Sequence, residues 1–217
     1  MKMKQLVLAV TAAIVAPAVL AAPITGLVNT GAGLPDNSQD SNYVLTVTQG
    51  STVLSSNQGY VADQAGWPDA SPWIGENGLS KWLTPFEDEA TTLDAQIDGI
   101  YKWSLSFNLT GADLSATSFS GRWAADNIGT VLLNGISIGA SLGFGSWSGF
   151  SATSGFIAGN NTLEFIVTNQ AQSSGNPTGL RVEFLQTNTS SVPEPESYAL
   201  LLGSLGLLGL ASRRRAK

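Results

Sequence analysis

The sequence has 217 residues, contains neither cysteine nor histidine, and carries a formal net charge of −6 at neutral pH. Without cysteine there are no disulfides and no thiolate chemistry. Without histidine there is no Ser-His-Asp triad and none of the usual zinc sites. Residues 22–191 contain fourteen acidic and four basic side chains, a net charge of −10. This acidity argues against binding to nucleic acid or to anionic lipid headgroups.

Residues 1–21 are predicted to be a secretory signal peptide. Lys2 and Lys4 form its basic region, and the stretch Leu6–Leu20 forms its apolar region. The small residue Ala21 suits signal peptidase, so cleavage is expected after it. The chain is therefore expected to be exported.

The exported part is long enough for one domain with a hydrophobic core. Residues 22–70 form a lead rich in Gly, Asn, Ser and Asp, and its alternating stretch Tyr43–Thr48 predicts one strand. We expect this lead to belong to the same β-sandwich as residues 71–187. The segment Tyr60–Pro85 is predicted to be irregular, because prolines and glycines separate three tryptophans, Trp67, Trp73 and Trp82.

The acidic stretch Glu87–Asp98 is expected to be a solvated loop. Its end, Asp94-Ala95-Gln96-Ile97-Asp98-Gly99, matches the start of a calcium-binding EF loop. The twelfth position, which should be a bidentate Glu, is Leu105. No cofactor and no metal site are therefore predicted, and calcium at this loop is the alternative.

The clearest local structure is Tyr101–Leu109, where apolar and polar residues alternate strictly, so that one face should be buried and the other wet. Asn134-Gly135 is a strong hairpin signal. Five further strands are expected: Ser118–Trp123, Thr130–Leu133, Ile136–Ile138, Asn161–Thr168 and Leu180–Leu185. Short strands joined by Gly, Asn and Pro turns predict an all-β antiparallel sandwich, with a jelly roll as the best single topology.

Six short motifs follow one another between Ser71 and Leu185. They are Lys81-Trp82, Tyr101-x-Trp103-x-x-x-Phe107, Gly121-Arg122-Trp123-Ala124-Ala125-Asp126-Asn127, Leu133-Asn134-Gly135, Gly159-x-Asn161-Thr162-Leu163 and Gly179-Leu180-Arg181-Val182. This order is similar to that of galactose-binding-like jelly rolls in secreted bacterial proteins. The resemblance implies the fold, and many such domains bind sugars or calcium. Without a ligand, Asp126-Asn127 is expected to close an Asx-turn between strands.

Sugar binding requires an exposed aromatic face for stacking, with Asn, Asp or Arg nearby for the hydroxyl groups. Trp147 lies in the glycine-rich stretch Gly143–Phe150, which is expected to be a loop at one end of the sandwich. The carbohydrate-binding candidates are Trp147, Trp73, Trp67, Asp126 and Asn127. For each tryptophan the alternative is a large side chain that plugs the end of the sandwich.

The last twenty-six residues combine three signals. Pro193-Glu194-Pro195 precedes the uncharged apolar run Tyr198–Ala211, and Arg213, Arg214 and Arg215 follow it. This succession resembles the PEP-CTERM sorting signal of bacterial exosortase substrates, which makes residues 188–217 a linker plus sorting signal. The run would rise about 21 Å as a helix, against about 30 Å of hydrocarbon, so we expect a short transmembrane helix that anchors the chain transiently in the inner membrane.

In this orientation the arginine cluster stays cytoplasmic. The alternative is an ordinary C-terminal helix that packs on the domain, although the run has no polar face to meet water. Signal peptidase and an exosortase are the partners expected during export, and no nucleic acid is expected.

Two classes of function remain. The first is a secreted, non-enzymatic protein of the cell surface or extracellular matrix that associates with the exopolysaccharide of a biofilm. The second is a polysaccharide-cleaving enzyme, which would need two carboxylates about 5 to 9.5 Å apart across a cleft. Carboxylates gather in Glu87–Asp98 without an aromatic-lined pair on strands, so no catalytic residue is predicted.

Overall fold

The computed structural model describes residues 21–63, 72–192, 202–209 and 212–213. The strands are β1 (Gln39–Gln49), β2 (Gln58–Val61), β3 (Leu83–Thr84), β4 (Gly99–Asn108), β5 (Ser118–Asp126), β6 (Ile128–Leu133), β7 (Ile136–Ser141), β8 (Ser148–Ala152), β9 (Asn160–Asn169) and β10 (Gly179–Asn188). A short 3-10 helix, η1, spans Leu114–Ala116. In the C-terminal tail, residues 202–209 are helical. Across the described segments, no helix combines the length and apolar character needed to traverse a bilayer.

The ten strands form one sheet in the order β7-β6-β9-β4-β1-β2-β3-β10-β5-β8, and every neighbouring pair is antiparallel. The sheet curls until its two edge strands, β7 and β8, contact each other. At this seam a Cβ on Gly139 would lie only 3.1 Å from the carbonyl oxygen of Gly149.

Two facing layers result, with β6, β9, β4 and β1 in the first and β3, β10, β5 and β8 in the second. The chain crosses between these layers from β3 to β4, from β4 to β5, from β5 to β6, from β8 to β9 and from β9 to β10. Such crossing connections are those of a jelly roll. The predicted antiparallel jelly-roll sandwich is confirmed.

Aromatic side chains from both layers fill the core. Trp123 of β5 contacts Phe165 of β9, with ring centroids 5.5 Å apart. Phe119 makes edge-on contacts with four other phenylalanines, Phe107, Phe150, Phe156 and Phe184. The alternation predicted for Tyr101–Leu109 is present in β4, whose apolar residues point into this core.

All seven predicted strands are present, and most extend a few residues further than predicted. In the β6–β7 hairpin Asn134 and Gly135 have φ values of 49° and 83°, the positive angles that a type I′ turn needs. β2, β3 and β8 were not predicted. Residues 143–147 of the loop expected over Gly143–Phe150 are a loop, but residues 148–150 belong to β8, in which Phe150 and Ala152 point inward while β8 pairs with β5.

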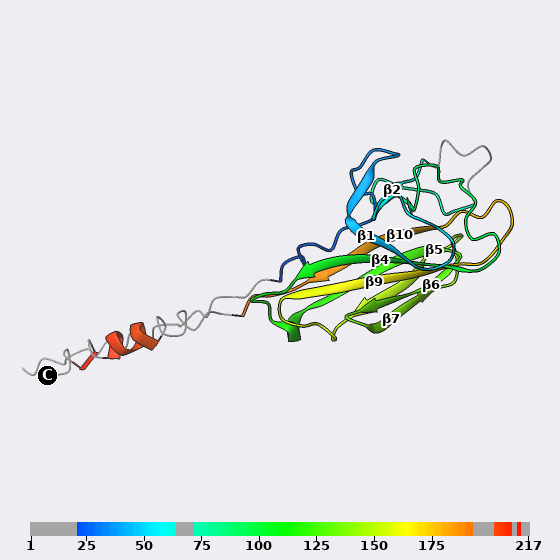
Figure 1. Ribbon diagram of the computed structural model, residues 1–217. Helices are drawn as coiled ribbons and strands as arrows, with labels where there is room; N and C mark the ends of the chain where they lie inside the picture. Colours follow the sequence, from blue (N-terminus) through cyan, green and yellow to red (C-terminus); the bar gives the residue numbers. More distant parts are fainter. Residues whose placement is uncertain (1–20, 64–71, 193–201, 210–211, 214–217) are drawn as a thin grey trace, which may run out of the picture.

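The two ends of the sandwich differ. At one end, called the base, residues 22–25, 108–117, 155–160 and 188–192 gather where the described chain enters the sandwich and where it leaves towards the C-terminal tail (Figure 1). Ala22 and Thr189 form an isolated β-bridge there. At the opposite end, called the far end, the acidic loop that follows β3 lies beside the β9–β10 loop, where the Leu93 N–H donates to the Asn176 carbonyl over 2.8 Å.

Candidate functional site

The candidate residues lie on the outer face of the second layer, towards the far end. On β5 and β10 the residues that point away from the core include Arg122, Arg181 and Glu183. Residues 72–82 and the loop before β8 cover this face with an aromatic cluster separate from the main core. Its members are Ala62, Trp73, Ile74, Trp82, Ala124, Phe144 and Trp147.

Trp73 and Asp126 meet in this cluster, but both are buried, each 4% exposed. The Trp73 ring packs on Trp82 with centroids 4.5 Å apart, and its indole N–H donates to Asp126 Oδ2 over 2.8 Å. The polar atoms of Trp73 and Asp126 thus bind each other and both side chains are covered, and their contact with a sugar stays a prediction.

Trp147 is half-buried in the loop before β8. The guanidinium carbons of Arg122 and Arg181 lie 4.5 Å and 4.7 Å from its ring centroid. Such cation–π contacts hold a ring in a fixed orientation. Of the other two candidate tryptophans, Trp73 is buried and Trp67 lies outside the described residues. Trp147 is therefore the one described candidate tryptophan that reaches the surface.

Arg181 anchors the covering segment. This guanidinium is fully buried and donates to the carbonyl oxygens of Ile74 and Gly75 and to Ser80 Oγ, over 3.2, 2.6 and 2.7 Å. Burial lowers the pKa of Arg181, and the nearby Glu183 opposes that shift.

Glu183 forms ion pairs with both arginines. Arg122 Nη2 lies 2.6 Å from one of its carboxylate oxygens, and Asn77 and Ser80 donate to the other over 2.8 Å. Burial by itself would raise the pKa of Glu183, but the hydrogen bonds from Asn77, Ser80 and Arg122 hold it below its usual value. The patch that carries Trp147 is thus built on a paired ionic network.

Asn127 is half-buried, and its side-chain oxygen accepts a hydrogen bond from the Gln170 N–H over 2.7 Å. The Asx-turn expected from Asp126-Asn127 is corrected, because Asp126 accepts from Trp73 and Asn127 accepts from the β9–β10 loop. Sequence reasoning did not select Arg122, Arg181 and Glu183 for the site. Their charges at outward positions of alternating strands were the available signal.

Asp126 makes folding dependent on pH. Burial raises its pKa from an ordinary 3.8 to about 6, and the hydrogen bond from Trp73 opposes this only in part. Between these values the folded protein keeps a proton that the unfolded chain has lost, so the free energy of unfolding should fall as pH rises from about 4 to above 6, by at most about 3 kcal/mol. Urea unfolding across this range measures the slope. Asp126→Asn, which stays neutral, should flatten it, and an unchanged slope in this variant would contradict the assignment.

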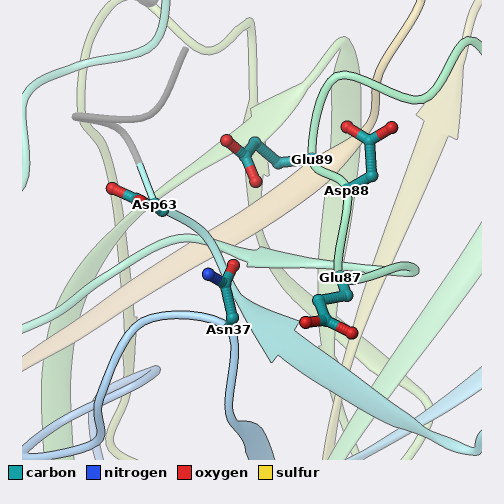
Figure 2. A pocket seen from close by; sticks show the side chains of 5 residues that line it. All are labelled: Asn37, Asp63, Glu87, Asp88 and Glu89. Atoms are coloured by element: carbon teal, nitrogen blue, oxygen red, sulfur yellow. The ribbon is translucent and has the colours of Figure 1, made fainter.

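Carboxylates also gather in a hollow of about 420 Å³ lined by Asn37, Asp63, Glu87, Asp88 and Glu89. Figure 2 shows the three consecutive side chains Glu87, Asp88 and Glu89 pointing in different directions. Burial raises the pKa of Glu89, and the nearby Asp63 and Asp88 add to the shift. The described lining contains no aromatic side chain, so the hollow offers no stacking surface for a sugar beside its carboxylates.

Asp94 begins the segment that matches an EF loop. It is buried, and one of its carboxylate oxygens accepts hydrogen bonds from the Tyr101 hydroxyl and from Asn169 Nδ2, over 2.6 and 3.0 Å. Within the described ranges, no group of three or more acidic side chains is arranged to hold a metal ion. Asp94 therefore links its loop to β4 and β9, and calcium here stays an untested alternative.

Residues 191–215 match the model of the PEP-CTERM protein-sorting motif. The chain is thus a jelly-roll sandwich that carries a PEP-CTERM sorting motif after its last strand. The motif implies export and sorting at the membrane. Its triplet Pro193-Glu194-Pro195 and Arg214 and Arg215 lie outside the described residues, and Arg213 is exposed. No curated protein matches the chain.

Three solved structures are similar to this chain. The PA14 sugar-binding domain from an RTX adhesin shares 15% identity over 45% of this chain and 56% of its own, with a TM-score of 0.26. The match thus spans little more than half of that domain. A family 35 carbohydrate-binding module from an environmental isolate shares 12% identity over 72% of this chain and 97% of its own, with a TM-score of 0.32.

The third structure is a family 11 carbohydrate-binding module from Clostridium thermocellum in complex with a beta-1,3-1,4-mixed-linked tetrasaccharide. It shares 11% identity over 73% of this chain and 93% of its own, with a TM-score of 0.30. Identities and TM-scores this low carry no argument about what this chain binds.

Proposed function

We propose that the protein is a non-enzymatic component of the cell surface or extracellular matrix that associates with biofilm exopolysaccharide. Signal peptidase removes residues 1–21, the apolar run holds the chain briefly in the inner membrane, and an exosortase releases it. The sorting motif over residues 191–215 supports this route. Residues 202–209 of the run expose Leu202, Leu207 and Leu208, side chains that lipid would cover.

The proposal of polysaccharide binding depends on the position of Trp147, which is fixed by two arginines and partly exposed. A sugar ring presents an apolar CH face, which stacks on an indole that is held in place and partly open to solvent. Arg122 and Arg181 lie over the Trp147 ring, and the side chain of Arg122 is itself 35% exposed, so part of this side chain is open to sugar hydroxyls next to the ring. Because the mature domain is acidic overall, a neutral glycan is the ligand that this patch suits best.

Trp147→Ala is expected to abolish retention of the mature protein on exopolysaccharide from its host. Only part of the side chain is buried, so the free energy of unfolding should fall by about 1 to 2 kcal/mol, which leaves the protein folded. Retention is measured by co-sedimentation and folding by thermal unfolding. Leu142→Ala is the matched control, since Leu142 lies in the same loop and is 88% exposed.

Retention of the wild type should also tolerate salt, because stacking on a neutral sugar is screened far less than an interaction between charged polymers. Undiminished retention by a folded Trp147→Ala protein would show that Trp147 is not part of the binding site. A large loss of stability in this variant would show that Trp147 is a structural side chain that fills the end of the sandwich. Release of soluble sugar fragments during the assay would support the polysaccharide-cleaving alternative.

A further inference from the structure

The sorting segment is joined to the sandwich by a very short connection. Hydrogen bonding to the fold continues as far as Val192, whose N–H donates to the Gly111 carbonyl over 3.0 Å. The apolar run begins at Tyr198, so only five residues intervene. Even fully extended, this stretch spans about 20 Å. Once the run enters the bilayer, the domain must therefore lie close to its surface.

The other chain end leaves from the same place. The Ala22 N–H donates to the Thr189 carbonyl over 2.7 Å, and the Thr189 N–H donates back over 2.8 Å. The Ile24 N–H donates to Thr187 Oγ1 over 3.1 Å. Before signal peptidase acts, both membrane segments would thus depart from the base, and the fold can form without pulling either one out of the bilayer.

Charge is distributed unequally along the sandwich. Among the residues that make up the base, Asp113 is the one charged side chain. Among the described residues the far end carries seven acidic side chains: Asp63, Glu87, Asp88, Glu89, Asp94, Asp98 and Asp126. Anionic headgroups repel carboxylates, and the repulsion acts over roughly a Debye length of about 8 Å at physiological salt. The base is therefore the end that approaches a bilayer at least cost.

We infer that the base is a membrane-facing surface, which lies against the lipid headgroups while the sorting segment is inserted. The far end then points away from the membrane, and the Trp147 patch, which lies towards that end, is accessible before release. This inference rests on the membrane step of the proposed function and is independent of polysaccharide binding. It assigns the partner of the base as the headgroup surface.

The absence of native cysteine allows single labels to test this orientation. Thr110→Cys places a fluorophore at an exposed position of the base, and Ser173→Cys places one at an exposed position of the β9–β10 loop. The full chain from Ala22 to Lys217 is reconstituted into phosphatidylethanolamine and phosphatidylglycerol vesicles that contain a headgroup-attached quencher. The ten-residue strands span about 30 Å, so the base label should be quenched severalfold more than the far label.

Co-flotation with the vesicles checks insertion in the same samples. A chain that does not co-float would contradict the membrane step of the proposed function and this inference with it. A chain that co-floats with equal quenching of both labels, or with no quenching of either, would overturn the orientation alone. If the base label were shielded from the quencher only in vesicles that also contain an exosortase, the base would face a protein partner, and the inferred contact with lipid headgroups would be wrong.

Discussion

Trp103→Ala is expected to lower the free energy of unfolding by about 3 to 5 kcal/mol. Trp103 is fully buried in β4, between Leu45 of β1 and Phe165 of β9. Its ring fills the space over Gly59 so closely that a Cβ there would lie 2.2 Å from it. Truncation therefore leaves a cavity that rigid strands on both sides cannot close.

Urea unfolding of the mature protein measures the loss. Ser104→Ala is the matched control, because Ser104 is the next residue of β4 and its side chain lies on the half-exposed outer face. Trp103→Phe should cost less than half as much, since the buried indole N–H has no hydrogen-bond partner within the described structure and phenylalanine leaves a smaller cavity. Equal losses for Trp103→Ala and Ser104→Ala would mean that the buried face of β4 is wrongly assigned.

Replacing Pro193, Glu194 and Pro195 together with alanine is expected to stop processing almost completely. Proline holds an extended backbone and cannot continue a helix, whereas alanine favours one. The triple variant thus removes the side chains of the triplet together with two residues that disfavour a helix. The protein should then remain in the inner membrane with its C-terminus intact.

Fractionation of the native host, with mass spectrometry of the C-terminus, measures the outcome. Glu196→Ala is the matched control, because it removes the same charge three residues after Pro193 and leaves the triplet unchanged. A triple variant that is processed and located like the wild type would show that the triplet is not the sorting signal.

Seven of the ten strands, and the buried face of those that alternate clearly, could be predicted from the sequence. A two-residue period is a local property, so Tyr101–Leu109 and Leu180–Leu185 revealed which side chains face the core. The hairpin at Asn134-Gly135 was equally local, because the two residues tolerate the positive φ angles that the turn requires. The sorting motif was readable for a similar reason, since its three parts are contiguous and their chemistry does not depend on the fold.

What covers the outer face of the second layer depends on tertiary contacts that the sequence pattern does not reveal. Alternation places Arg181 and Arg122 outward, but it does not say that residues 72–82 fold over them or that Trp147 stacks on both. Those contacts join residues far apart in sequence, as when Trp73 turns inward to Asp126. The meeting of Ala22 and Thr189 at the base is likewise set by the path of the whole chain, because strand pairing between distant segments is fixed by packing and not by local pattern.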